Sequence, residues 1–306
     1  MNLLTPKLDI VFKLLFTADT DLLADLINSV LKLPEESRII SVEVKNPGIL
    51  PDEITKKFIV LDIRATDNNS RHYDIEIQVR KYESYPKRTL YYVSRMYADQ
   101  LKTGDDYGTL SPVIGIHFLD YELFPGHDDF HFHFYMRDTR YPGLELTDDL
   151  SVHIFELPKP DKVRQSAPDS DMTEWIRFFN HAHEEAEKSM RTRYKNPAVH
   201  KAFDLLEKIS ADEETRRKAE IREKALMNEV SMLSAARREG EKTGITIGIE
   251  KGEKIGIEKG EKLAGQKTAG QLLSLNILTV QQIAGATGLS TDEVIKLAGG
   301  ACQAKS

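Results

Sequence analysis

Apolar and polar residues alternate in two neighbouring stretches of the chain, residues 57–65 and 72–79. Alternation with a period of two is typical of β-strands. The residues between the two stretches include Asp, Asn and Ser, which tolerate the backbone angles of a tight turn. The sequence therefore predicts a β-hairpin. A loop centred on Asn69 places Asp62 directly opposite Glu76.

The two faces of this hairpin differ in polarity. Side chains two residues apart point to the same face of a strand, so Asp74 and Gln78 share the face of Asp62 and Glu76. The other face is apolar and is expected to lie in the core. It carries Ile59, Leu61, Ile63, Ile75, Ile77 and Val79.

Further strands and helices are predicted on both sides of the hairpin. Apolar residues recur at three- and four-residue spacings over residues 9–33, which is typical of a helix. A second helix is expected from Pro86 to about Lys102, because proline suits the first turn of a helix. Its predicted buried stripe consists of Leu90, Val93, Tyr97 and Leu101. Helical patterns resume from Thr173. The mixture of strands and helices indicates an α/β fold. Further strands are predicted at residues 38–46, 113–119, 130–136 and 150–157.

The C-terminal third of the chain changes character twice. Residues 212–238 are rich in Ala, Glu and Lys with a thin apolar seam, which predicts an exposed or coiled helix. An eight-residue repeat follows, in which glycine falls at every fourth position from Gly240 to Gly260. Glycine costs a helix interior about 1 kcal/mol relative to alanine. The repeat is therefore either a flexible tether or a helix whose bare stripe lets another helix approach closely.

Residues 269–299 have a helix-turn-helix pattern. Thr279 and Ser290 are predicted to cap two helices, with Gly288 in the turn between them. The second helix opens with two acidic residues rather than with side chains that hydrogen-bond to base edges. We therefore expect a protein-interaction or regulatory unit. The predicted organisation is a catalytic domain over 1–211, a linker over 212–268 and a small helical unit over 269–306.

Charge and composition limit the classes of function that this protein can have. The net charge is −7, with 15 basic and 15 acidic residues in 1–104 but 3 basic and 12 acidic residues in 105–161. A basic groove in the N-terminal half is compatible with this distribution, whereas a nonspecific coat of DNA is not supported. No apolar run reaches the roughly 18 residues that cross a membrane. The N-terminus lacks a leader pattern, and Cys302 is the single cysteine. We expect a soluble, cytoplasmic protein without a membrane partner.

The opposed acids Asp62 and Glu76 are the main candidates for chemistry. Directly opposed residues have Cβ atoms roughly 4.5–5.5 Å apart, so two carboxylates there repel each other. A divalent cation removes this conflict, because Mg²⁺ takes one or two protein carboxylates and keeps waters for substrate phosphates. The alternative is a solvated outer face of an edge hairpin, with Arg64 and Arg80 as ion-pair partners.

Three histidines on the predicted strands raise the question of a zinc site. His131 and His133 share one strand face, and His153 lies on a later strand. No cysteine or further close histidine completes a site with recognisable spacing. The pattern favours the polar face of an antiparallel strand.

Several motifs resemble one protein family. Asp62, a turn and then Glu76-Ile77-Gln78 resemble the D…ExQ variant of the PD-(D/E)XK nuclease core, and Asp9-x-x-Phe12-Lys13 resembles the D-x-x-F-K opening of one branch. That branch comprises the PD-(D/E)XK transposase-like proteins, which include the recombination-promoting nucleases (Rpn). The resemblance covers about residues 5–160. Its downstream matches are Arg88, Tyr91, Ser94, Tyr97, Gln100, Leu101, Gly104 and Tyr107.

The resemblance implies a restriction-endonuclease-like mixed sheet flanked by helices and followed by a helical tail. It implies a metal-dependent DNA endonuclease linked to recombination, mobile elements or phage defence. Asp62, Glu76 and the carbonyl of Ile77 would bind Mg²⁺ or another divalent cation. Asp9 would reach the metal site from the first helix, although an Asp at this place also suits a helix cap.

Gln78 stands where the wider superfamily has lysine. Its amide orients a water molecule but carries no charge and cannot deprotonate it. Lys13 or Lys81 would then supply the missing cation. Arg88 and Tyr91 are the further candidates for contact with DNA, through a phosphate and a sugar or base. The other reading of these residues is the charged face of a surface helix.

Two other functions stay open. One is a catalytically degenerate nuclease fold that binds DNA or protein, and the other is a self-assembling interaction protein that uses the glycine repeat. Apolar residues of the last helices need a partner, because about 30 residues bury little surface alone. We therefore expect a homo-oligomer formed through the C-terminal tail, or a tail that packs on the core and inhibits it.

Overall fold

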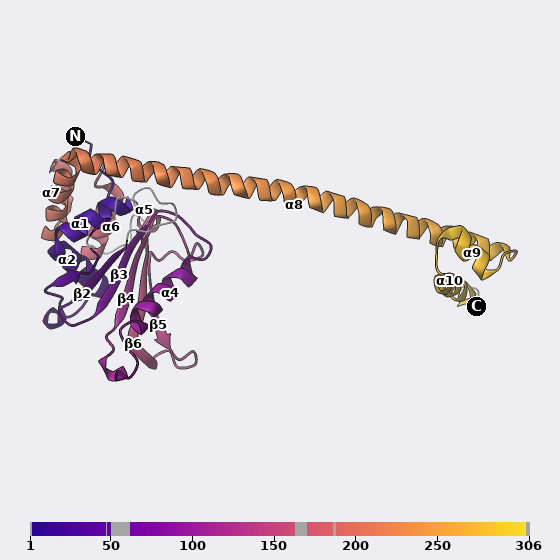
Figure 1. Ribbon diagram of the computed structural model, residues 1–306, viewed down its shortest axis with the longest axis horizontal. Helices are drawn as coiled ribbons and strands as arrows, with labels where there is room; N and C mark the ends of the chain where they lie inside the picture. Colours follow the sequence, from indigo (N-terminus) through magenta and orange to yellow (C-terminus); the bar gives the residue numbers. More distant parts are fainter. Residues whose placement is uncertain (1, 47, 50–61, 163–169, 186–187, 304–306) are drawn as a thin grey trace. The chain divides into compact units, whose positions relative to one another are not determined.

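The structure is a computed structural model that describes residues 2–46, 48–49, 62–162, 170–185 and 188–303 (Figure 1). The chain divides into two compact units, Met1–Glu229 and Val230–Ser306. None of the described helices combines the length and the apolar composition needed to cross a bilayer.

The first unit is built on a mixed sheet, which within the described residues has six strands in the order β1-β2-β3-β4-β6-β5. The central pairs β3/β4 and β4/β6 are parallel, whereas β1/β2, β2/β3 and β5/β6 are antiparallel. The predicted mixed sheet is therefore confirmed. The strands are β1 (Val42–Val44), β2 (Ile63–Asp67), β3 (His72–Gln78), β4 (Val113–Leu119), β5 (His131–Arg137) and β6 (Glu145–Glu156).

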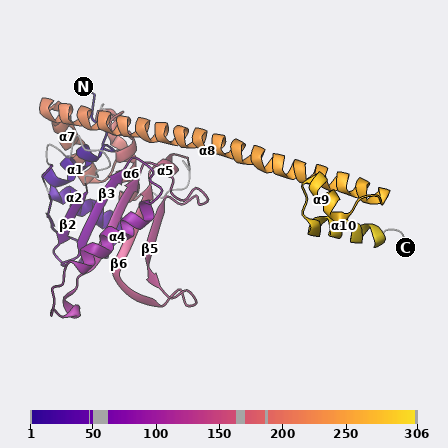
Figure 2. The ribbon, with the colours of Figure 1, turned by 45° about the vertical axis from the view of Figure 1, so that its right-hand side comes forward.

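Helices cover both faces of this sheet. The main core lies on the face that receives α1, α2, α6 and α7. There Phe12 of α1 packs against Phe118 of β4 and Phe179 of α6, at 6.0 and 5.6 Å between ring centroids. Helix α4 lies on the opposite face, over β4 and β6 (Figure 2). These helices are α1 (Asp9–Ala18), α2 (Thr20–Leu31), α4 (Tyr85–Ala98), α6 (Asp171–His181) and α7 (Pro197–Ala211), with the short α5 (Pro158–Lys162) after β6.

The predicted hairpin is present. Ile63 pairs with Ile75 and Arg64 with Asp74, so the ladder continues toward Asp62 opposite Glu76. The apolar face is buried as expected, since Ile63, Ile75 and Ile77 lie in the core cluster. The predicted strand residues 57–61, including Ile59 and Leu61, lie outside the described part of the chain.

Two element boundaries and one buried helix face differ from the predictions. The single helix expected over 9–33 is two helices, because the Asp19 side chain accepts a hydrogen bond from the Asp21 N–H and caps α2. The first strand is shorter than predicted. Helix α4 buries Tyr85, Thr89 and Val93 but leaves Leu90 exposed, so the predicted buried stripe through Leu90 is wrong.

The glycine repeat lies within one continuous helix, α8 (Glu213–Leu275). Of the alternatives considered, the structure has the helix rather than the tether. A Cβ added at any glycine from Gly240 to Gly260 meets no atom within 4 Å, so the stripe is bare. The predicted boundary at 211/212 falls just before α8. The first compact unit continues to Glu229, because Arg222 and Glu229 are buried in contact with it.

The second unit has a small core of its own. The end of α8 packs against α9 (Val280–Thr287) and α10 (Thr291–Gln303). Thr279 caps α9 in a capping box, Ser290 hydrogen-bonds with Glu293 at the start of α10, and Gly288 has a φ of +69°, as predicted. The apolar residues of the tail therefore pack partly against one another. Their buried set is Ala269, Ile283, Ala284, Leu289 and Val294.

Close packing of α4 on β4 depends on Gly115. A Cβ added there would lie 2.8 Å from His117 Nε2 and 3.0 Å from Val93 Cγ1, and both side chains are buried. We expect Gly115→Ala to lower the free energy of unfolding by about 1–3 kcal/mol, the range for overpacked sites. Urea denaturation of the full chain measures this. Gly126→Ala is the control, because its Cβ meets no atom within 4 Å; equal stabilities of the two variants would contradict this packing account.

Candidate active site

A row of polar side chains on β3 is buried beneath α4. Asp74, Glu76 and Gln78 are each exposed by only 4 to 5%. They occupy the sheet face opposite the apolar core, as the alternation in the sequence predicts. Asp62 lies immediately before β2 and is half-buried. The four side chains therefore gather at one end of the β2/β3 ladder.

Glu76 has a charged partner from α4. Its Oε1 accepts a hydrogen bond of 2.5 Å from Arg88 Nη2, and its Oε2 lies 3.9 Å from His117 Nδ1. Burial raises the pKa of Glu76 to about 8, against the lowering effect of Arg88, and the carboxylates of Asp74, Asp62 and Asp9 raise it further. Glu76 is therefore a carboxyl group in electrostatic contact with three other acids.

Asp62 is held by its own neighbours. Its Oδ2 accepts a 2.9 Å hydrogen bond from Arg64 Nε, and its Oδ1 accepts one of 3.3 Å from Asn46 Nδ2. The Asn46 amide also contacts the backbone carbonyl of Asp62 and accepts from the Arg64 N–H. This fixes the Asp62 side chain beside the end of β1.

Asp9 is paired with the long helix. Arg222 of α8 donates from Nε at 3.1 and 3.0 Å and from Nη2 at 2.6 Å to the two oxygens of Asp9. Asp9 lies in the first turn of α1 and also accepts from the Ile10 N–H. The Asp9 carboxylate is thus close enough to raise the pKa of Glu76, but its oxygens are hydrogen-bonded to Arg222.

Arg88 is the cation beside Gln78. Gln78 Oε1 lies 3.4 Å from Arg88 Nη2, and Gln78 Nε2 donates to the carbonyl of Arg80 at 3.1 Å. Of the two lysines considered for this role, Lys81 is hydrogen-bonded elsewhere. Lys13 is buried in α1, and Lys81 Nζ donates to the backbone carbonyl of Glu122.

The backbone of β3 directs a carbonyl group toward Asp62. The Gln78 carbonyl accepts a 2.9 Å hydrogen bond from the N–H of Asp120, which follows β4. Backbone groups of successive residues point to opposite sides along a strand. The carbonyl of Ile77 therefore faces β2, on the side where Asp62 lies.

The chemistry of these donors fits a hard divalent cation. Two carboxylates and one carbonyl offer oxygen ligands, and Mg²⁺ binds proteins through few ligands while keeping several waters. Among the described residues, no group of three or more His, Cys, Asp or Glu side chains is arranged to hold a metal ion. The candidate set of Asp62, Glu76 and Ile77 has two such side chains, so solvent and substrate would complete the coordination.

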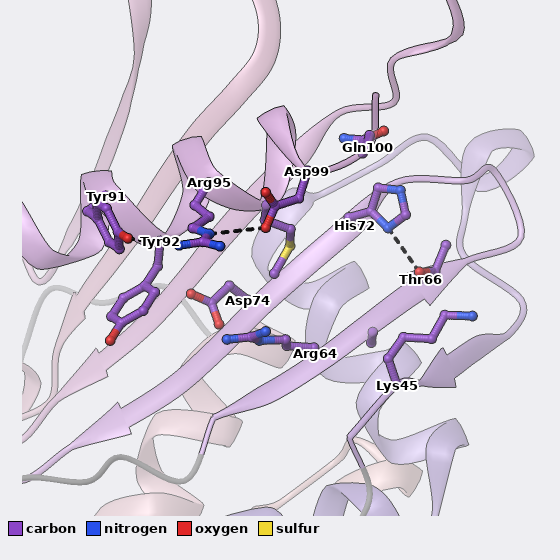
Figure 3. Close-up of a pocket in the computed structure, with 12 residues that line it drawn as sticks. Lys45, Arg64, Thr66, His72, Asp74, Tyr91, Tyr92, Arg95, Asp99 and Gln100 are labelled. Atoms are coloured by element: carbon purple, nitrogen blue, oxygen red, sulfur yellow. Dashed lines mark hydrogen bonds and ion pairs between the residues drawn. The ribbon is translucent and has the colours of Figure 1, made fainter. Parts of the chain in front are cut away.

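A cleft of about 620 Å³ lies next to these carboxylates, on the same face of the sheet (Figure 3). Strands β2 and β3 form its floor and α4 forms one wall. Tyr91, placed here by α4, is 56% exposed. Basic, acidic and aromatic side chains line the cleft, among them Lys45, Arg64, His72, Asp74, Tyr91 and Arg95.

Four further residues belong to the site but were not among the predicted site residues. His117 of β4 is the ladder partner of Glu76, Asp74 lies two residues before Glu76 on β3, and Tyr85 OH hydrogen-bonds with His117 Nδ1 at 3.0 Å. Burial lowers the pKa of His117 to about 3, so its imidazole is neutral. Asp74 shares the predicted polar face and was identifiable from alternation. The partnership of Arg222 with Asp9 has no local sequence signal.

The three strand histidines stack across β5 and β6. Ring centroids of His133 and His153 are 4.0 Å apart, and His131 Nε2 hydrogen-bonds with His153 Nδ1 at 3.0 Å. Burial lowers the pKa of His131 to about 4 and that of His153 to about 3. His153 is buried, so the predicted polar face is only partly solvated.

Comparison with known proteins identifies one family. The family model described as PD-(D/E)XK nuclease family transposase matches residues 6–236, which includes all the described strands and the first turns of α8. No curated protein and no solved structure matches the chain.

The buried acids make the stability of the metal-free protein depend on pH. Burial raises the pKa of Glu76 from 4.5 to about 8 and that of Asp74 from 3.8 to about 7. The folded state therefore binds more protons than the unfolded state between these values, and the free energy of unfolding falls as the pH rises through this window. One pKa unit corresponds to about 1.4 kcal/mol.

We expect Glu76→Gln to reduce this loss of stability at higher pH. In EDTA, the fall in unfolding free energy between about pH 5 and about pH 8 should shrink by at least ~1 kcal/mol relative to wild type. Urea denaturation at both pH values measures it. Glu43→Gln, on the exposed side of β1, is the control. The same pH dependence in wild type and Glu76→Gln would refute the burial effect on Glu76.

Proposed function

The chain belongs to the family of PD-(D/E)XK nuclease family transposases, and on this basis we propose that it is a Mg²⁺-dependent DNA endonuclease. The observation that carries the proposal is the pairing of Ile63 with Ile75, because the same register continued by one residue sets Asp62 opposite Glu76. Gln78 and Arg88 lie beside Glu76. The biological setting proposed is recombination, mobile elements or phage defence.

The proposed metal ligands are the carboxylates of Asp62 and Glu76 and the carbonyl of Ile77. A divalent cation bound there supplies an activated water and neutralises charge on the phosphate under attack. Gln78 orients the attacking water through its amide. Asp62 and Glu76 would hold the cation as carboxylates, because a metal ligand must be deprotonated.

In this proposal Arg88 provides the positive charge that a lysine provides in the wider superfamily. In the structure its guanidinium neutralises Glu76 and contacts Gln78. With Glu76 bound to a cation, Arg88 would be available to bind an oxygen of the DNA phosphate, for which a guanidinium is well suited. Tyr91 supports the DNA from the adjoining cleft. Asp9 acts through its charge and through its ion pair with Arg222. A contact of Lys13 with the substrate stays a prediction.

A second candidate function is supported by the arginine partners. Each of the three predicted catalytic acids forms an ion pair with arginine: Asp9 with Arg222, Asp62 with Arg64 and Glu76 with Arg88. A fold in which these pairs persist would bind DNA or protein without cleaving it. Retention of the Asp62, Glu76 and Gln78 set favours the nuclease.

The nuclease proposal predicts that Asp62→Ala and Glu76→Ala each lose divalent-dependent cleavage. Outer-shell partners of a metal typically contribute about 10–100-fold to activity, so loss of a direct ligand should lower the rate by at least about 100-fold. A plasmid-nicking assay with Mg²⁺ and with EDTA measures this, with circular dichroism to verify folding. Glu36→Ala, at an exposed acid that does not line the cleft, is the matched acid control. Wild-type cleavage by either site variant would remove Asp62 and Glu76 from the proposed site.

We also propose that the chain forms a homo-oligomer through its tail. The six glycines from Gly240 to Gly260 leave one stripe of α8 bare, and isoleucines beside it are exposed by 45 to 64%. Residues 248–263 carry equal numbers of Glu and Lys, so the same segment of a second chain complements their charge. Small residues let two helix backbones approach closely.

Triple replacement of Gly248, Gly252 and Gly256 by alanine tests this assembly. Each change raises intrinsic helix stability by about 1 kcal/mol, yet the added methyl groups would block close approach. We expect a dimer to become a monomer in light scattering, with cleavage per chain retained. Gly270→Ala, on α8 outside the repeat, is the control. A monomeric wild type would disprove the tail interface, and faster cleavage by the variant would indicate inhibition by the tail instead.

A further inference from the structure

The cleft beside the candidate active site is lined from three elements. Arg64 of β2 and Asp74 of β3 are ladder partners on its floor, and Tyr91, Tyr92 and Arg95 descend from α4 (Figure 3). Asp74 is two residues from Glu76 on the same strand face, which corresponds to roughly 7 Å. A molecule bound at Asp74 therefore lies close to the proposed metal ligand Glu76.

Asp74 is buried without a hydrogen-bonding partner. It is 4% exposed, and no hydrogen bond or ion pair to its carboxyl group occurs within the described part of the chain. Asp9, Asp62 and Glu76 all have arginine partners. Asp74 lines the cleft, where its carboxyl oxygens can accept hydrogen bonds from the N–H groups of a ligand.

Two tyrosines form an exposed aromatic wall above Asp74. Tyr91 and Tyr92 are 56 and 41% exposed, and their ring centroids are 5.5 Å apart at 70° between planes. The Tyr91 hydroxyl accepts from Arg95 Nη1 at 3.2 Å, which steadies one ring. Bases of any sequence can stack on exposed aromatic side chains. These rings suit the face of a nucleobase.

Cationic groups surround the same space. Lys45, Arg64 and Arg95 line the cleft, and each pairs with an acid at the rim or beyond it. Their side chains are about half exposed, so a phosphate can reach them. The cleft thus combines an N–H acceptor, aromatic faces and phosphate-binding cations.

The size of the cleft selects among nucleic-acid ligands. Its volume of about 620 Å³ falls within the range of about 300–1,000 Å³ for small-molecule sites. A base inside duplex DNA is stacked on both faces and paired along its edge, so it offers neither to the protein. A base enters such a pocket only when it is unpaired or flipped out.

We propose that this cleft binds one unpaired deoxynucleotide adjacent to the cleaved phosphate. Asp74 accepts hydrogen bonds from the Watson–Crick edge of the base, Tyr91 and Tyr92 contact its face, and Arg64 and Lys45 bind the flanking phosphate. The inference rests on the proposed nuclease function and names its preferred substrate, which is DNA with an unpaired nucleotide at the cleavage point.

Binding in EDTA tests the inference without cleavage. The probe is a short DNA duplex with a single unpaired 2-aminopurine, compared with the same duplex fully paired, with affinity measured by fluorescence anisotropy. 2-Aminopurine has an amino group on its Watson–Crick edge that can donate to Asp74. We expect the full chain to bind the unpaired probe at least tenfold more tightly than the paired one.

Variants locate the effect in the cleft. Asp74→Asn and the double variant Tyr91→Ala/Tyr92→Ala should each reduce the tenfold preference to near unity. Tyr107→Ala is the control, because Tyr107 is 81% exposed and does not line the cleft. It should bind like wild type.

Several results would overturn the inference. They are equal affinity for paired and unpaired probes, loss of preference in Tyr107→Ala, tighter binding of the same bulge in RNA, and full competition by micromolar free deoxynucleotide. Mg²⁺-dependent plasmid nicking by the same preparation separates the two proposals. Nicking without a preference for the unpaired probe refutes this inference alone, whereas preference without nicking refutes the nuclease and leaves a nucleotide-binding cleft.

Discussion

Neutralisation of buried carboxylates is the constraint on which the arrangement of this protein depends. Asp74 and Glu76 on β3, together with Asp9 of α1, are each less than 6% exposed. Buried charges are strongly destabilising unless paired and hydrogen-bonded. Glu76 is paired with Arg88 of α4 and Asp9 with Arg222 of α8, whereas Asp74 has no ion-pair partner among the described residues. The positions of α4 and of the first part of α8 are therefore coupled to the acids of the site.

Helix α8 belongs to the site as well as to the tail. Arg222 binds Asp9, and Glu229 binds Arg80 at 2.9 Å and the Tyr82 hydroxyl at 2.5 Å, directly after the end of β3. Truncation before these residues would leave Asp9 as an unpaired buried charge. This explains why the first compact unit extends through Glu229 and why the family match continues beyond α7.

Local patterns predicted the hairpin but not the partners of its acids. Alternation and the loop centre gave the register that the structure has at Ile63 and Ile75. Leu90 was misplaced, because the buried face of α4 is set by the space above Gly115, a tertiary feature. Arg222 is 213 positions from Asp9, so no local spacing links them. The unpartnered state of Asp74 likewise depends on what the fold brings near it.

The central claim is that Asp62 and Glu76 form a binding site for a divalent cation. Binding of Mn²⁺ to the full chain, followed by electron paramagnetic resonance as a stand-in for Mg²⁺, tests it most directly because it needs no DNA. Wild type should bind Mn²⁺, and Asp62→Asn and Glu76→Gln should each weaken that binding by at least about tenfold. Failure of wild type to bind Mn²⁺ at millimolar concentration, or equal binding by both variants, would contradict the claim.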